Sequence, residues 1–311
     1  MSDTEQLLGG LSAAQFLAQY WQRKPLLIRG ALPDWPSPIE PDELAGLALE
    51  PAVESRLVLE HGASPWEVRH GPFKENTFAQ LPASDWTLLV QGLDLWVPEA
   101  AGLLDHFDFL PRWRLDDVMA SFAVPGGSVG PHFDQYDVFL LQVEGQRRWQ
   151  IGARCDDATP LLEGPDLKIL ADFTAQDEWL LEPGDMLYLP PLVSHWGIAE
   201  TQCMTFSVGF RSPGIADMLA ELTVQLLESG RGGIYKDPPL DPTMSGQEID
   251  RKFVAQARRQ LLALLDDEQM LGDWFARTMT APKYPDLVHL TGERRQAQFA
   301  GKTYRNGEVC D

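Results

Sequence analysis

Cysteine is scarce in this chain, and long apolar runs are missing from it. The 311 residues include three cysteines, Cys155, Cys203 and Cys310, and none of them forms a Cys-x-x-Cys pair. This small and scattered set excludes a disulfide framework and favours a reducing compartment. No stretch of about 18 consecutive apolar residues occurs, and the N-terminus is polar and acidic. We therefore expect a cytoplasmic protein without a membrane span or a signal peptide.

Basic residues are also few. The chain has 25 Lys and Arg against 46 Asp and Glu, a formal net charge of −21, and residues 1–232 alone carry −20. A general nucleic-acid-binding protein needs a basic face, so we expect no direct nucleic-acid binding. The acidic part of the chain would attract cationic partners, although acidity also serves solubility alone.

The hydrophobic pattern changes after Pro213. Residues 54–210 contain many short apolar or alternating segments separated by turn residues, which predicts a sandwich or barrel of β-strands. Residues 215–229 repeat their apolar side chains at helical spacing, and residues 230–243 are rich in Gly and Pro. A capping box at residues 245–248 then predicts a long amphipathic helix. We predict a catalytic domain over residues 1–212, a helical region with a linker over 213–240, and a C-terminal module over 241–311.

The segment that carries the most chemical information is residues 126–137, with the sequence GGSVGPHFDQYD. His132 and Asp134 are two residues apart, and on an extended chain such residues point to the same side. An imidazole and a carboxylate would then lie together, as a metal site requires. The His-x-Asp pattern alone occurs often by chance. The glycine-rich segment before His132 and a distant histidine strengthen the interpretation as a metal site.

A third ligand has to come from elsewhere, and His195 is the strongest candidate. It follows a Pro183-Gly184 turn, a short apolar strand over residues 186–189 and a proline corner. Two histidines and one carboxylate form the facial triad of non-haem Fe(II) oxygenases, which leaves further metal positions open. The remaining histidines lack this setting and are typical of surface or packing positions. They are His61, His70, His106 and His289.

A dicarboxylate cosubstrate would need a cation inside the barrel, and Arg147 is the arginine that we expect there. It shares one face of its strand with Trp149 and Ile151, whereas Arg148 lies on the other face. Because the apolar face should point inward, Arg147 could hold a carboxylate with two parallel hydrogen bonds. Ser121, on the strand that leads into the glycine-rich loop, could add a hydroxyl group.

With these residues in place, the segment 124–149 resembles the cupin-type JmjC protein hydroxylases, and more closely the bacterial ribosomal oxygenases. The segments FLAQYWQRKPLLIRG (residues 16–30) and FSVGFR (residues 206–211) are similar to the same family. The resemblance covers most of the chain and is strongest over residues 10–30 and 115–212. It implies an α+β fold with a double-stranded β-helix (a cupin/JmjC jelly roll), then a helical dimerisation region and a small winged-helix-like module.

The resemblance also implies a reaction. In that family an arginine of large-subunit ribosomal protein sixteen is hydroxylated with Fe(II), 2-oxoglutarate and O₂. Carried over to this sequence, His132, Asp134 and His195 would bind Fe(II), and Arg147 with Ser121 would bind the distal carboxylate of 2-oxoglutarate. The net charge of −20 over residues 1–232 suits a basic ribosomal protein as partner. A homodimer is implied as well, while the residues that bind the protein substrate match no motif and stay unassigned.

Other functions remain open from the residues alone. A cupin metalloenzyme such as an isomerase would use Zn²⁺ or Mn²⁺ at the same ligands without O₂. A non-catalytic cupin would bind a partner and would not need His132. Within the oxygenase class, another protein residue or a small molecule could be the substrate. The ligand set does not decide the metal, since Fe, Mn, Co and Zn all accept it.

Overall fold

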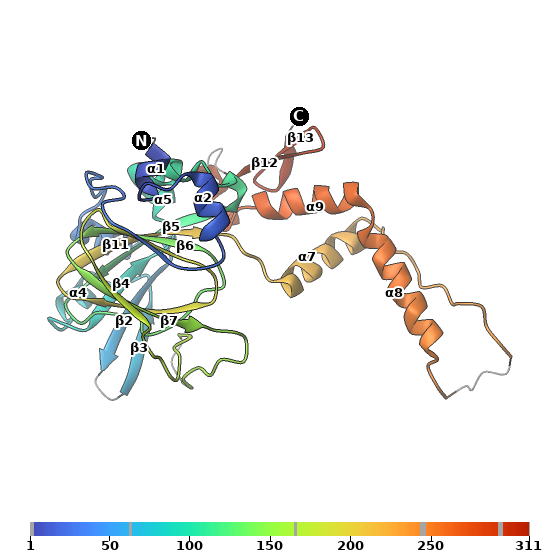
Figure 1. The fold of residues 1–311 in the computed structure, drawn as a ribbon, viewed down its shortest axis with the longest axis horizontal. Coiled ribbons are helices and arrows are strands. Elements are labelled where there is room, and N and C mark those ends of the chain that lie inside the picture. The colour runs from blue at the N-terminus through green and yellow to red at the C-terminus, as the bar shows by residue number, and fades with distance from the viewer. Residues whose placement is uncertain (1–2, 62–63, 165–166, 243–246, 292–294, 311) are drawn as a thin grey trace. The chain divides into compact units, whose positions relative to one another are not determined.

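The computed structural model describes residues 3–61, 64–164, 167–242, 247–291 and 295–310 (Figure 1). The chain divides into two compact units, Met1–Ser212 and Pro213–Asp311. The division lies where the hydrophobic pattern changes, and the segments 213–240 and 241–311, predicted separately, belong to one unit. Within the described ranges, no helix is long and apolar enough to cross a membrane.

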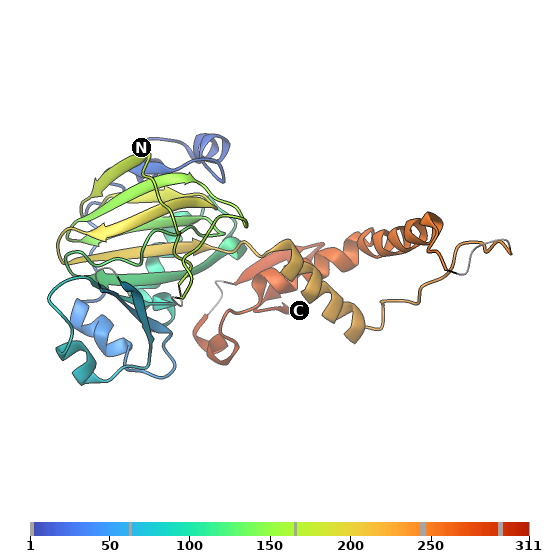
Figure 2. The ribbon, with the colours of Figure 1, turned by 90° about the horizontal axis from the view of Figure 1, so that it is seen from below.

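Antiparallel strands form most of the first unit. They are β1 Leu26–Ile28, β2 Ser55–His61, β3 Ser64–His70, β4 Trp86–Val90, β5 Leu115–Ala123, β6 Val138–Glu144, β7 Arg147–Arg154, β8 Asp177–Leu181, β9 Met186–Leu189, β10 Val193–Ala199 and β11 Cys203–Phe210. One sheet has the order β1-β9-β6-β11-β5-β4-β2-β3, and a smaller sheet has the order β10-β7-β8. Figure 2 shows the strands of this unit from a second direction. Isolated bridges pair Ser128 with Ile198 and His132 with His195, so the segment 128–132 lies beside β10.

Short helices surround these sheets. They are α1 Asp3–Leu7, α2 Ala13–Gln19, α3 Pro41–Leu47, α4 Glu75–Ala79, α5 Leu93–Trp96 and α6 Pro98–Ala101, with the 3₁₀ helices η1 Gly102–Phe107 and η2 Arg112–Arg114. The start of α2 follows its sequence, because Ser12 and Gln15 form a reciprocal capping box. Helices α5, α6 and η1 follow one another along the chain between β4 and β5.

The larger sheet has a different core on each of its faces. Phe139 and Leu141 of β6 join the large apolar cluster that also contains Phe16 and other residues of the helices. Val138 and Leu140, the alternate residues, join a second cluster with Trp149 of β7. This alternation is the two-residue period of a strand. The second cluster fills the space between the two sheets, which is the interior of a double-stranded β-helix.

The second unit is mainly helical. It contains α7 Ile215–Glu228, α8 Arg251–Leu265, α9 Glu268–Thr280, η3 Pro285–Leu287 and α10 Val288–Thr291, followed by the antiparallel strands β12 Gln296–Phe299, β13 Lys302–Arg305 and β14 Glu308–Cys310. The predicted capping box includes Ser245, which lies outside the described residues. Helix α8 begins at Arg251 instead, where the side chain of Asp250 accepts a hydrogen bond from the backbone N–H of Lys252.

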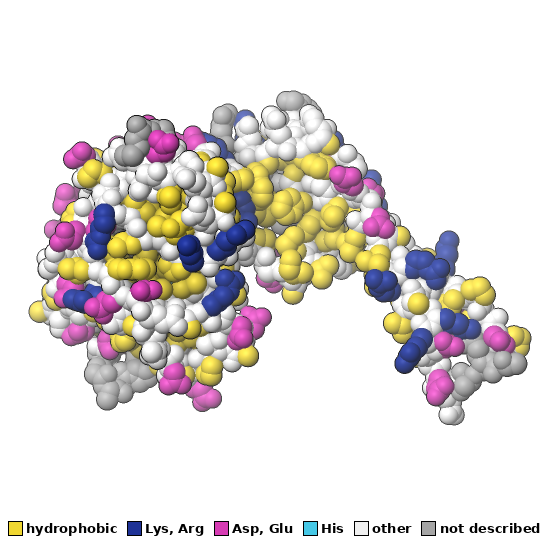
Figure 3. All heavy atoms as spheres, in the orientation of Figure 1, with side chains coloured by type: hydrophobic (Ala, Val, Ile, Leu, Met, Phe, Trp, Pro, Cys, Tyr) yellow, Lys and Arg dark blue, Asp and Glu magenta, His cyan; other side chains and the backbone are white. Residues whose placement is uncertain are grey.

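Only part of the apolar surface of these helices is buried within the unit. Leu222 of α7 packs with Met270 and Trp274 of α9. Helix α8 has no buried residue. Figure 3 shows hydrophobic side chains gathered over α7 and α9, and Lys and Arg side chains along α8. The helices therefore carry apolar side chains that the unit itself does not cover.

Candidate metal centre

His132, Asp134 and His195 converge at the start of β10. Their potential ligand atoms all lie within 4.8 Å of one another. The Nε2 atom of His195 is 3.7 Å from Oδ2 of Asp134, and the centroids of the two imidazole rings are 4.3 Å apart. Among the side chains that the structure describes, this is the one group of three or more His, Cys, Asp or Glu residues that could hold a metal ion.

Backbone hydrogen bonds bring the two segments together. The N–H of His132 donates to the carbonyl of His195 at 3.0 Å, and the N–H of His195 donates back at 2.8 Å. The N–H of Leu192 donates to the carbonyl of Asp134 at 2.7 Å. The His-x-Asp segment is thus extended, as its spacing requires. His195, however, lies within a strand that the sequence analysis does not predict, because a bulge between Val193 and His195 breaks the alternation.

Both imidazoles are oriented by backbone carbonyl groups. Nδ1 of His132 lies 2.9 Å from the oxygen of Gly130, and Nδ1 of His195 lies 2.9 Å from the oxygen of Val193. A carbonyl only accepts, so Nδ1 carries the proton and Nε2 keeps a free lone pair for a metal. Burial, together with the neighbouring His132, lowers the pKa of His195 to about 4. The ring is therefore neutral near pH 7, as metal ligation requires.

Arg147 lies inside the barrel. It is 5% exposed, and its Nη1 donates to Ser121 Oγ at 3.0 Å and to Thr205 Oγ1 at 3.3 Å. Arg148 lies on the outer face of β7 and pairs with two surface glutamates. Burial lowers the pKa of Arg147, and its surroundings within the described chain include no paired carboxylate. Its Nε is buried without a hydrogen-bond partner. An anionic ligand would satisfy this group.

Two buried polar residues beside Arg147 are absent from the sequence analysis. Thr205 Oγ1 donates to Gln142 Oε1 at 3.0 Å, and the amide nitrogen of Gln142 donates to the carbonyl of Glu144 at 2.7 Å. Because the Thr205 proton points to Gln142, the Thr205 oxygen is free to accept from Arg147. A signal was available in β11, where Cys203, Thr205 and Ser207 alternate with large apolar residues. Such a pattern indicates a polar interior face.

Tyr136 is two residues beyond Asp134 and is affected by several carboxylates. Tyr136 is 42% exposed, and its pKa is raised chiefly by the charge of Asp134, then by partial burial and by Asp117 and Asp116. Gln91 donates to the buried Asp117 at 2.8 Å, and Arg211 contacts Asp116 at 3.2 Å. Both of these carboxylates therefore already have partners within the protein.

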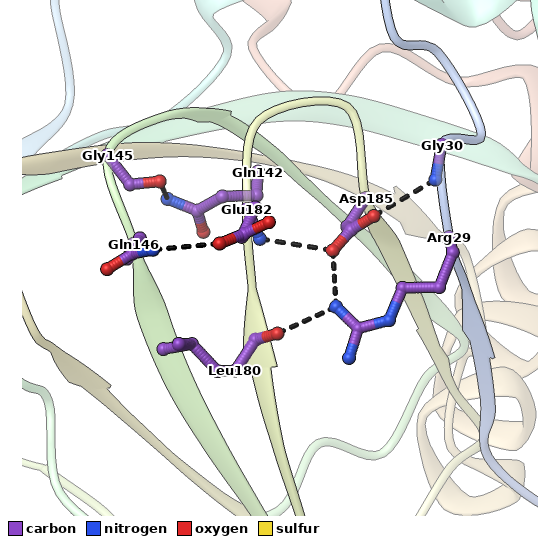
Figure 4. Close-up of polar contacts among 8 residues, drawn as sticks. All are labelled: Arg29, Gly30, Gln142, Gly145, Gln146, Leu180, Glu182 and Asp185. Atoms are coloured by element: carbon purple, nitrogen blue, oxygen red, sulfur yellow. Dashed lines mark hydrogen bonds and ion pairs between the residues drawn. The ribbon is translucent and has the colours of Figure 1, made fainter.

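The turn at Pro183 and Gly184, which precedes the strand that leads to His195, is a structural corner. Figure 4 shows Asp185 of this corner next to Arg29 and Gly30. Asp185 contacts Nη1 of Arg29 at 2.5 Å and accepts from the N–H of Gly30 at 2.9 Å. Gly184 has a φ of +88°, and a Cβ atom there would lie 2.7 Å from Cα of Pro33. This corner attaches the N-terminal segment to β9.

The other histidines are not part of this cluster. His70, His106 and His289 belong to no described group of potential metal ligands. The side chain of His61 lies outside the described residues. Within the described chain, the third ligand candidate that the geometry supports is therefore His195.

The chain is similar to several known proteins. Residues 102–218 match the JmjC domain family. The ribosomal protein uL16 3-hydroxylase of Escherichia coli (strain K12) is 38% identical over 97% of this chain and 86% of its own length. A probable ribosomal oxygenase of Haemophilus influenzae is 40% identical over 82% of this chain and 60% of its own length. The solved structure of YcfD, a ribosomal oxygenase from Escherichia coli, in complex with cobalt and 2-oxoglutarate, has a TM-score of 0.83 at 34% identity and covers 97% of this chain and 86% of that one.

Proposed function

Because this chain belongs to the JmjC-domain ribosomal oxygenases, we propose that it hydroxylates an arginine side chain of a large-subunit ribosomal protein. It is a 2-oxoglutarate-dependent oxygenase, and its cofactor is Fe(II) with O₂ as the second cosubstrate. The observation that carries the proposal is the convergence of His132, Asp134 and His195 in the same barrel as the buried Arg147. A ribosomal substrate is met in the cytoplasm, the localisation that the sequence predicts.

His132, Asp134 and His195 would hold the metal. Two neutral imidazoles whose Nε2 lone pairs are free, with one carboxylate, form the donor set of the facial triad. Fe(II), when bound, supplies the oxygen-activating chemistry, in which 2-oxoglutarate becomes succinate and CO₂ and one oxygen atom enters a C–H bond of the substrate. The task of the protein is to position the reactants and to keep water away from them.

Arg147 would bind the distal carboxylate of 2-oxoglutarate, supported by Ser121. Both contacts of Nη1 are to hydroxyl groups, so the guanidinium is fixed in place but its charge is not neutralised. A buried guanidinium is stable only with an anion, and its planar donors match a carboxylate in geometry. The dicarboxylate would therefore supply the negative charge that balances Arg147 in the barrel interior.

A basic substrate would be favoured by charge. The net charge of −20 over residues 1–232 would attract a basic ribosomal protein.

The second unit would serve assembly. Ile215 and Leu227 of α7 are 73% and 74% exposed, and Val254 and Leu261 of α8 are 61% and 63% exposed. Amphipathic helices with this exposure suit a dimerisation region for a second copy of the chain. Helix α9, the short α10 and the strands β12–β14 fit a winged-helix-like module. Residues 233–311 have a net charge of −1, which favours protein contact over nucleic acid.

The test is turnover on ribosomal proteins. The Fe(II)-loaded protein is incubated in air with 2-oxoglutarate and purified ribosomal protein uL16, and succinate and intact mass are measured. We expect succinate formation together with a mass gain of one oxygen atom, which fragmentation assigns to an arginine. Asp134→Ala should lose both, while Gln135→Ala, an exposed neighbour, should keep both. Succinate without any mass gain on uL16 would contradict the proposed substrate, and no succinate at all would contradict the class.

A further inference from the structure

Two buried hydrogen-bond donors occupy neighbouring inward positions of β7. They are Nε of Arg147 and the indole Nε1 of Trp149, and neither has a partner among the described residues. Both residues are 5% exposed. Seven side-chain atoms of this kind occur in the described chain. These two share one strand and one face beside the metal cluster. Buried donors nearly always have a hydrogen-bond partner, so two neighbouring donors without one indicate a ligand-binding position.

Trp149 lies between the two ends of the candidate site. The guanidinium carbon of Arg147 is 5.7 Å from the centroid of the Trp149 ring. On the other side, the ring centroids of Trp149 and His195 are 5.8 Å apart. A dicarboxylate that reaches from the metal ligands to Arg147 would therefore pass along the indole.

The orientation of the indole is set by Gly197. The two residues are paired in register between β7 and β10. A Cβ atom on Gly197 would lie 2.7 to 3.0 Å from the Cη2, Cζ3 and Cε3 atoms of Trp149. The benzene edge of the indole thus rests on bare backbone, and any side chain at Gly197 would displace it. Nε1 is on the opposite edge of the ring system, turned away from Gly197.

We propose that Trp149 is a further cosubstrate-binding residue, whose indole N–H donates a hydrogen bond to the dicarboxylate that Arg147 holds. The inference rests on the proposed function, because it takes Arg147 as the carboxylate-binding group. Arg147 supplies the charge, and Trp149 supplies a neutral donor that fixes the direction of the carboxylate. Gly197 provides the space that this position of the indole requires.

The experiment measures 2-oxoglutarate binding by calorimetry in the Mn(II)-loaded full-length protein without O₂. Trp149→Phe keeps a ring but removes the donor, and we expect binding to weaken about tenfold, which corresponds to about 1.4 kcal/mol. Mn(II) affinity should not change. Trp179→Phe is the matched control, because Trp179 is the register partner of Trp149 on β8. The Trp179→Phe variant should bind 2-oxoglutarate with the affinity of the wild type. Gly197→Ala should weaken binding as Trp149→Phe does.

A second measurement leaves the wild-type side chains in place. In protein with ¹⁵N-labelled tryptophan, the indole N–H signal that Trp149→Phe removes should shift downfield when 2-oxoglutarate binds the Zn(II)-loaded protein. Unchanged affinity in Trp149→Phe would overturn the inference, and so would an unshifted indole signal. If Trp149→Phe fails to fold, unchanged affinity in Gly197→Ala has the same meaning. Absence of 2-oxoglutarate binding in the wild type would instead overturn the proposed function.

Discussion

The two units of the chain differ in what they leave unsatisfied. Among the described residues of the first unit, the most exposed large hydrophobic side chain is Tyr136 at 42%, whereas in the second unit Ile234 reaches 87% and Ile249 reaches 82%. In the first unit, two donors on one face of β7, at Arg147 and Trp149, are buried without a partner among the described residues. The second unit leaves apolar surface outside. The unpaired donors of the first unit favour a small anion as ligand. The exposed apolar side chains of the second unit favour contact with another protein surface.

The largest effect, on the KM for 2-oxoglutarate, should come from removing the buried positive charge of the first unit. Arg147→Met removes the buried cation, and Arg148→Met makes the same change on the outer face of β7. Truncating one member of a buried charge pair costs on the order of 2–4 kcal/mol, so the KM for 2-oxoglutarate should rise by at least about 30-fold in Arg147→Met. Arg148→Met removes ion pairs that are exposed to solvent and screened by it, and should leave KM unchanged. Equal KM values in the two variants would contradict the assignment of Arg147.

A second effect concerns the stability of the metal-free protein. The pKa of His195 is about 4 in the folded chain, compared with 6.5 for a histidine side chain exposed to solvent. Between these two pH values the unfolded chain binds a proton that the folded chain excludes, so the free energy of unfolding falls as pH falls through this window. We expect the thermal midpoint of the metal-free wild type to fall more steeply from pH 7 to pH 4.5 than that of His195→Gln. Parallel curves would show that His195 is not held neutral by its burial.

The smallest effect on catalysis should come from the second unit. Leu261→Glu places a charge on the exposed apolar face of α8, and Ala263→Glu places the same charge on the other side of the helix. We expect Leu261→Glu to shift the protein toward monomers in sedimentation velocity, whereas Ala263→Glu should match the wild type. Binding of 2-oxoglutarate should be unchanged in both. A wild type that sediments as a monomer would contradict the proposed dimer.

The sequence predicts a strand well where a short apolar segment stands between two turns. The strand predicted over residues 186–189 has the bounds of β9. Strand β10 is not predicted, because its bulge at His195 and its Gly197 interrupt the pattern. Strand β10 nevertheless carries His195, the third ligand candidate. The sequence analysis selects His195 because a turn, a short strand and a proline corner precede it.

The alternation of β7 was also enough to separate Arg147 from Arg148, since one face of that strand is clearly apolar. The alternation of β11 marks Thr205 as an inward polar residue, but the contact between Gln142 and Thr205 could not be found in the same way. Their hydrogen bonds join two strands that lie far apart in the sequence, and only the register between β6 and β11 brings them together. The tautomers of the histidines likewise depend on backbone carbonyls, which no side-chain pattern encodes.

The central claim is that the interior of the first unit holds a metal ion and a dicarboxylate. The most direct test is a crystal structure of the Mn(II)-loaded protein with 2-oxoglutarate, grown without O₂ and with the metal located by anomalous scattering. The account predicts one metal peak bonded to Nε2 of His132, Nε2 of His195 and the carboxylate of Asp134, with the distal carboxylate of 2-oxoglutarate on Arg147. A metal peak away from these three side chains, or a cosubstrate that leaves Arg147 without an anion, would contradict it.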